Sequence, residues 1–160
     1  MAMPDDFEVE SLYTPDQWYV DDVLEVTKER VRAITDTSKM GAVVAAQKPW
    51  PGQPKHVPGI LMIQITGTLG NIHAVYGLGL KMTEGWVGFG THIHEASFRN
   101  LGEIGPPIEL ELVADKVKSV RGQTFGRYSF RFEQAGKLLY TSKQTAVWTR
   151  NVPSQHSASQ

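Results

Sequence analysis

Hydrophobic and polar residues alternate through much of the C-terminal half of this 160-residue chain. Ile108, Leu110 and Leu112 are apolar, whereas Glu109 and Glu111 between them are charged. A period of two predicts antiparallel strands with one face in water and the other on a core. The pattern predicts four such strands, over Trp86–Asn100, Ile108–Val120, Thr124–Glu133 and Leu138–Arg150.

Two further strands are predicted near the N-terminus, over Tyr19–Thr27 and Arg30–Thr37, around the polar turn Lys28-Glu29. The segment before them, residues 1–15, is acidic and contains prolines, which predicts a flexible, loosely held arm. The C-terminal residues 152–160 are polar and are predicted to be a disordered tail. A single domain is therefore expected over residues 16–151.

The long apolar run Gly59–Leu80 is ambiguous by pattern alone. Its glycines and β-branched residues do not favour a helix, but its length exceeds that of a typical strand. Because Pro58 suits the start of a helix, we expect a long helix buried inside the protein.

If the run is helical, about 100° per residue places Gln64, Thr68 and Asn71 on one narrow polar stripe. Gly67 lies beside this stripe and Gly70 a little further round, where another backbone or an acyl chain could approach closely. Thr66 and His73 fall on the opposite side of the helix. We expect His73 to be a satisfied core or interface residue.

Composition narrows the class of protein. The formal net charge of −1 offers no basic excess for nucleic acid, and the absence of cysteine excludes a disulfide framework or a thiolate nucleophile. The acidic N-terminus lacks the apolar core of a signal peptide, and polar residues interrupt the one long apolar run. We expect a cytoplasmic protein without a membrane span.

Residues 50–64 carry two Pro-Gly pairs directly before the apolar run, in the sequence WPGQPKHVPGILMIQ. This segment resembles the one that opens the central helix of the β-hydroxyacyl-thioester dehydratases. Val20–Glu25 is similar to the first strand of that family, and Ala96–Asn100 followed by Gly105-Pro106-Pro107 to a later segment. The resemblance extends over residues 13–150. It implies the hot-dog fold, an α+β fold in which a curved antiparallel sheet wraps a long central helix.

The resemblance also implies partners. Members of the family act on acyl thioesters carried on an acyl-carrier protein or on CoA, in fatty-acid or polyketide-type biosynthesis. They work as dimers, so a homodimer or a heterodimer with a related hot-dog subunit is expected. Neither a cofactor nor a bound metal is expected.

The catalytic pair of the family is not matched in this chain. The family uses a His and a Glu or Asp for proton transfer, and these positions here hold Pro49 (or Trp50) and Gln64. Gly59 matches the glycine whose backbone N–H binds the thioester oxygen at the helix N-terminus. His56, in the loop before Pro58-Gly59, is a candidate to move the proton, with a solvent-exposed loop histidine as the alternative.

Other residues are candidates for substrate binding. Lys55 and Arg99, with Lys48, would form a basic rim at the entrance, unless they are ordinary solvated side chains. Thr68 and Asn71 lie on the polar stripe of the helix. Three aromatic residues complete the candidate substrate contacts: Trp50, Phe89 and Phe98. For Phe89 and Phe98 the alternative is a place in the hydrophobic core.

His92 and His94 would point to the same face of a strand, a spacing that suits a metal site or an acid–base pair. A hydrogen-bonded or interfacial pair is the alternative.

The residues thus support several functions. The first is a dehydratase or isomerase with an atypical site built from Gly59, Gln64 and His56. The second is a catalytically silent subunit that pairs with an active partner or binds acyl chains. The third is a hot-dog thioesterase in which Gln64 orients a water, and a metal-dependent enzyme using His92 and His94 comes last.

Overall fold

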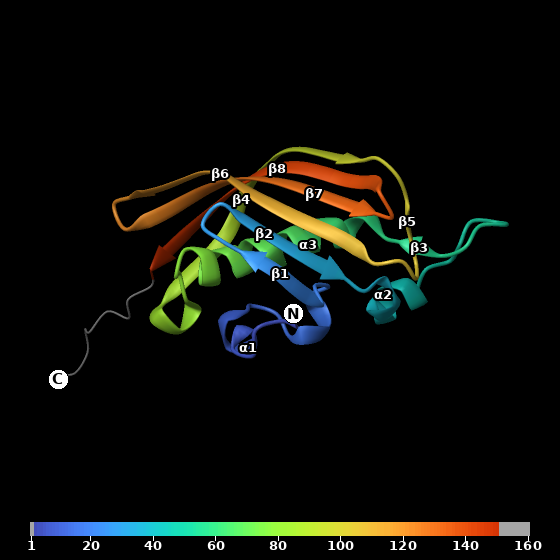
Figure 1. Cartoon of the computed structure of the whole chain (residues 1–160), viewed down its shortest axis with the longest axis horizontal. Coiled ribbons are helices and arrows are strands. Elements are labelled where there is room, and N and C mark those ends of the chain that lie inside the picture. The colour runs from blue at the N-terminus through green and yellow to red at the C-terminus, as the bar shows by residue number, and fades with distance from the viewer. Residues whose placement is uncertain (1, 151–160) are drawn as a thin grey trace, which may run out of the picture.

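A six-stranded antiparallel sheet packs against one long helix, α3 (Gly59–Ile72), in the computed structural model, which describes residues 2–150. Figure 1 shows the sheet arching over α3. In their order across the sheet, the strands are β1 (Asp22–Val26), β2 (Arg30–Thr35), β6 (Ile108–Val120), β7 (Gln123–Gln134), β8 (Lys137–Arg150) and β4 (Trp86–Phe98). The predicted α+β architecture, a central helix and a large antiparallel sheet, is confirmed.

Shorter elements connect these parts. β3 (His56–Val57) and β5 (Gly102–Glu103) form a separate two-stranded sheet. The remaining helices are α1 (Phe7–Glu10), α2 (Gly41–Ala45) and short 3₁₀ turns at Pro15–Gln17, Thr37–Lys39 and Met82–Glu84. No helix of residues 2–150 has the length and apolar character needed to cross a membrane.

The alternating pattern of the strands builds the core. On β6, Leu110 and Leu112 are buried, and they pair in register with Phe132 and Phe130 of β7. These side chains face α3, whose Ile65 and other apolar residues are buried against them. Each such side chain contributes about 1.5–3 kcal/mol on burial, so alternation in the sequence fixes which face of each strand carries the helix.

The central helix ends earlier than predicted. The regular α-helix stops at Ile72, and residues His73–Gly77 form a π-helical turn. A side chain at Gly77 would place its Cβ 2.6 Å from the carbonyl oxygen of Thr27, so this turn passes directly against the β1–β2 connection. Helical structure therefore reaches Gly77, as α-helix and then π-helix, and stops short of the predicted Leu80.

His73 is a satisfied core residue, as predicted. Its side chain is fully buried, with Nε2 2.8 Å from the carbonyl oxygen of Lys28 and Nδ1 3.2 Å from the hydroxyl oxygen of Tyr128. Neutral imidazole meets both contacts if Nε2–H donates to the carbonyl and Nδ1 accepts from the tyrosine.

The N-terminal segment is packed, whereas the sequence predicted a loosely held arm over residues 1–15. Phe7 is fully buried, with its ring centroid 4.9 Å from that of Trp18 and 6.3 Å from that of Tyr76. Burial of this one aromatic ring outweighs the acidic, proline-containing composition that suggested a loose arm. The predicted tail at residues 152–160 lies outside the described residues.

Replacement of Phe7 tests this packing. We expect Phe7→Ala to lower the free energy of unfolding by about 3–5 kcal/mol, because it leaves a cavity beneath α1. Val9→Ala, in the same short helix but 59% exposed, is the matched control and should change it by less than about 0.5 kcal/mol. Urea titration measures both; equal effects would contradict the packed segment.

Candidate functional site

The polar stripe predicted on α3 exists, and it binds the backbone of residues 10–18, which we call the N-terminal segment. Its three side chains each donate a hydrogen bond to a backbone carbonyl of that segment: Gln64 Nε2 to Gln17 (3.3 Å), Thr68 Oγ1 to Trp18 (2.9 Å) and Asn71 Nδ2 to Glu10 (3.1 Å). The stripe therefore faces residues 10–18.

A cavity of about 310 Å³ lies between α3, the sheet and this N-terminal segment. α3 contributes Thr66–Thr68, Gly70 and Asn71, the sheet contributes Trp86–Gly90, Tyr128, Phe130, Gln144, Ala146 and Trp148, and Leu80 and Met82 lie between them. The fourth side is Glu10–Tyr13. The cavity is mostly apolar and aromatic, which suits a hydrocarbon chain.

Two glycines open the helix side of this cavity. A Cβ added at Gly67 or Gly70 would meet no atom within 4 Å, and both residues line the cavity. The sequence indicated these two positions as places of close approach. In the structure they border empty space that an acyl chain can occupy.

The cavity wall offers little proton-transfer chemistry. Among the described residues that line it there is no histidine, and its one carboxylate, Glu10, accepts hydrogen bonds from the backbone N–H (3.1 Å) and the hydroxyl of Thr83. Burial raises the pKa of Tyr128 far above its usual value near 10. The described part of this wall therefore offers no histidine, and its one carboxylate is held by Thr83.

The N-terminus of α3 forms a second part of the site. Gly59 is the first helical residue, after Pro58, so its end of the helix carries unpaired N–H groups and the positive end of the helix dipole. The ring of Phe98 covers this position, because a Cβ on Gly59 would lie 3.1 Å from its Cε1. Thr66, where the cavity begins along α3, lies seven residues on, about 10 Å at 1.5 Å per residue.

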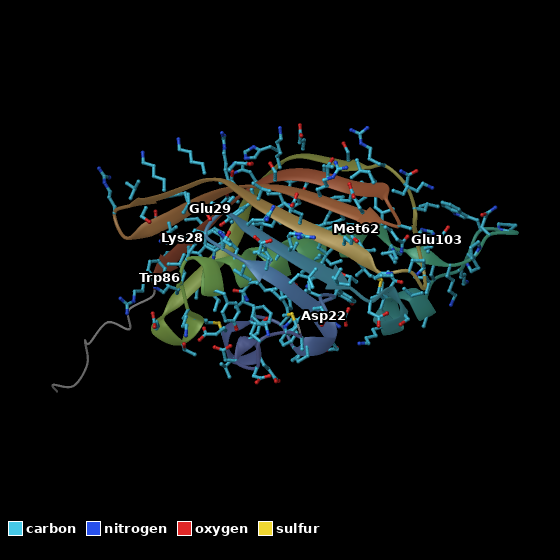
Figure 2. All side chains as sticks on the ribbon, in the orientation of Figure 1. Asp22, Lys28, Glu29, Met62, Trp86 and Glu103 are labelled. Atoms are coloured by element: carbon cyan, nitrogen blue, oxygen red, sulfur yellow. The ribbon has the colours of Figure 1, made fainter. Side chains whose placement is uncertain are left out.

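The candidate residues of the loop before α3 lie at the end of the molecule where α3 begins. His56 lies in β3, half-buried, with its ring centroid 5.3 Å from that of Trp50, which is 59% exposed. Lys55 Nζ donates to the carbonyl oxygen of Ala45 (2.8 Å), and Arg99 is exposed just after β4. In Figure 2, Glu103, which pairs with His56, and Trp86, in the cavity wall, lie at opposite ends of the sheet.

The predicted site residues therefore fall into groups. Trp50, Lys55, His56, Gly59, Phe98 and Arg99 belong to the end where α3 begins, and Thr68, Asn71 and Phe89 line the cavity. Gln64 lies in neither group, because its amide is bonded to the N-terminal segment. Sequence reasoning missed Leu12 and Tyr13 as wall residues; the available signal was the pair of large aromatic residues, Phe7 and Trp18, that anchor the segment.

His92 and His94 point to the same side of β4, as predicted. Their rings are nearly parallel, 6° apart in plane and 5.6 Å between centroids, and they contact the hydroxyls of Thr91 and Thr145. Within residues 2–150, no three His, Asp or Glu side chains are grouped as a metal site would need.

Comparison with solved structures confirms the hot-dog fold. The dehydratase heterocomplex ApeI:P from Xenorhabdus doucetiae matches with a TM-score of 0.62 at 14% identity, over 97% of this chain and 95% of that chain. A thioesterase from Haemophilus influenzae matches with a TM-score of 0.57 at 15% identity, over 88% of this chain and 85% of that chain.

A hypothetical thioesterase from Streptococcus pneumoniae, solved with coenzyme A, matches with a TM-score of 0.52 at 11% identity, over 81% of this chain and 86% of that chain. No protein-family model and no curated protein matches the sequence. At these identities the likeness shows the fold alone.

The buried His73 behind the cavity wall makes stability depend on pH. Burial lowers its pKa from the usual 6.5, so the unfolded chain takes up a proton near pH 6.5 that the folded chain does not yet accept. The free energy of unfolding is therefore highest above about pH 6.5 and falls below it, by at most about 1.4 kcal/mol per pH unit.

We expect His73→Gln to be less stable than wild type at pH 7.5 and to lose this dependence between pH 7.5 and 5.5. Urea titrations across that range measure it. His94→Gln, at an exposed histidine, is the control and should keep the wild-type slope. A wild-type slope in His73→Gln would contradict the role of His73.

Proposed function

We propose that this chain binds acyl thioesters as a dehydratase-type hot-dog subunit, and that a related partner subunit supplies the proton-transfer groups. The thioester carbonyl lies at the N-terminus of α3 and the acyl chain extends into the cavity. The observation that carries the proposal is an apolar cavity that begins about 10 Å along α3 from the helix N-terminus. Among its described wall residues there is no histidine, and the one carboxylate, Glu10, is held by Thr83.

The helix start supports the position of the thioester. Backbone N–H groups and the helix dipole stabilise negative charge that develops on a carbonyl oxygen. Gly59 keeps this end accessible to a ligand, since it adds no side chain and the covering ring of Phe98 is 55% exposed.

The missing acid–base pair supports the need for a partner. Pro49 and Trp50 have no group that exchanges a proton near neutral pH, and the amide of Gln64 neither ionises nor faces the cavity. His56 is the histidine in the loop before Gly59, so this chain alone is a second candidate for activity through that residue.

β4 provides a surface for the partner. It is 13 residues long and lies at the edge of the sheet, with one side unpaired in the described chain. Phe89, Ile93 and Phe98 along it are each more than half exposed, as is Ile60 on α3. A long exposed apolar edge favours pairing with another strand, so we propose a homodimer or heterodimer through β4.

Activity measurements with and without a partner test the proposal. We expect the purified chain to bind 3-hydroxyacyl and 2-enoyl thioesters of CoA or carrier protein without interconverting them. Co-expression with a dehydratase-type hot-dog protein from the same genome should give turnover, and Ile93→Arg on β4 should abolish it. Val117→Arg, at an exposed position of β6, is the matched control.

Turnover by the chain alone would contradict the partner requirement. Its loss in His56→Ala would then identify His56 as the base. Release of free thiol from a saturated acyl thioester would instead favour the thioesterase function, which the structural likeness to thioesterases supports to the same degree.

Filling the cavity tests where the acyl chain binds. Gly70→Leu would place a side chain in space that is empty in the structure, so acyl-thioester affinity should fall at least tenfold for long chains and less for acetyl. Gly70→Ala is the control: it should keep binding and gain up to about 1 kcal/mol of stability from helix propensity. Calorimetric titration measures both; unchanged binding by Gly70→Leu would place the acyl chain elsewhere.

A further inference from the structure

Four polar side chains form a cluster inside the otherwise apolar contact between α3 and β8. Tyr140, Ser142 and Gln144 alternate along β8, so they share the inner face of the sheet, and Thr66 meets them from α3. Gln144 Nε2 donates to Thr66 Oγ1 and to Ser142 Oγ, each at 3.1 Å. We call these four residues the β8 polar cluster.

The β8 polar cluster has hydrogen-bonding capacity left over. The Tyr140 side chain is fully buried, and its hydroxyl lies near Ser142 and Gln144 but makes no hydrogen bond of good geometry. Both N–H groups of Gln144 are engaged, while its Oε1 has only a 3.5 Å contact with Thr66. The hydroxyl of Thr66 donates to the carbonyl oxygen of Ile63 (2.6 Å).

An unpaired buried hydroxyl costs about 1–3 kcal/mol, so such a group is a sign of a missing ligand or water. The cluster offers a donor, the Tyr140 hydroxyl, next to an acceptor, Gln144 Oε1. A ligand hydroxyl satisfies both, because it accepts one hydrogen bond and donates another.

The position of the β8 polar cluster relative to Gly59 and the cavity indicates which part of a bound ligand would contact it. Phe98 connects the cluster to the helix N-terminus, because its ring covers Gly59 and its ring centroid lies 5.2 Å from that of Tyr140. On the opposite side of the cluster, Thr66 and Gln144 line the cavity. The cluster thus lies between the helix N-terminus and the cavity, where the carbons next to a thioester carbonyl would be found.

We infer that the β8 polar cluster is a subsite for the hydroxyl on the third carbon of a 3-hydroxyacyl thioester. The inference rests on the proposed function, since it takes the thioester at Gly59 and the chain in the cavity. Tyr140 donates to the 3-hydroxyl oxygen, the 3-hydroxyl donates to Gln144 Oε1, and Ser142 and Thr66 hold the Gln144 amide in place. These residues position the substrate and take no part in bond breaking.

Paired ligands test the subsite. Calorimetric titration compares 3-hydroxyacyl-CoA with the saturated acyl-CoA of the same length, on wild type and on Tyr140→Phe and Gln144→Met. We expect wild type to favour the 3-hydroxyacyl compound, and each variant to lose about tenfold in affinity for it while its affinity for the saturated compound stays within about twofold. Thr141→Val, whose residue alternates to the outer face of β8, is the control and should change neither.

The outcomes separate the two proposals. Wild type that binds both compounds equally, or variants that weaken both equally, overturn the subsite and leave the acyl cavity standing. Wild type that binds neither compound overturns the proposed function and the subsite with it. Thermal melts confirm folding, and Tyr140→Phe should melt no lower than wild type without ligand, because it removes an unpaired hydroxyl.

Discussion

Three hydrogen bonds between α3 and the backbone of residues 10–18 fix where the N-terminal segment lies in this molecule. Polar side chains that are partly or fully buried on a helix need partners, since a buried polar group without one costs about 1–3 kcal/mol. Gln64, Thr68 and Asn71 meet this requirement with the carbonyls of the N-terminal segment. The same contacts hold Glu10–Tyr13 along the helix, where these residues close one side of the cavity.

The strands, the helix start and the open glycine positions could be predicted from the sequence because each has a local signal. Alternation marked the strands, Pro58-Gly59 marked the helix, and Gly67 and Gly70 marked the open side of α3. The packing of the N-terminal segment has no local signal, because it depends on contacts between Phe7 and residues far along the chain such as Tyr76. For the same reason the sequence showed the polar stripe and left open what it binds.

The β8 polar cluster was not predicted from the sequence, because it too depends on contacts between residues far apart in the chain. Tyr140, Ser142 and Gln144 belong to a strand whose mixed composition suggests a wet inner face, yet α3 covers them. Their depth depends on where the helix lies across the sheet. Polar residues on a face that should be apolar are the sequence signal that could have identified them.

On the proposed function, this hot-dog protein keeps the binding half of a thioester site. The helix N-terminus, the apolar cavity and the polar cluster between them follow one line along α3. No histidine is present among the described residues of the cavity wall, so the proposed function assigns proton transfer to a second subunit across β4.

Nuclear Overhauser contacts between an isotope-labelled acyl-CoA and the amide-labelled protein test the central claim most directly. We expect contacts from the end of the acyl chain to Gly70 and Trp148, and a shift of the Gly59 amide resonance on binding. Contacts confined to the exposed loop around Trp50, with the Gly59 and Gly70 resonances unmoved, would contradict it.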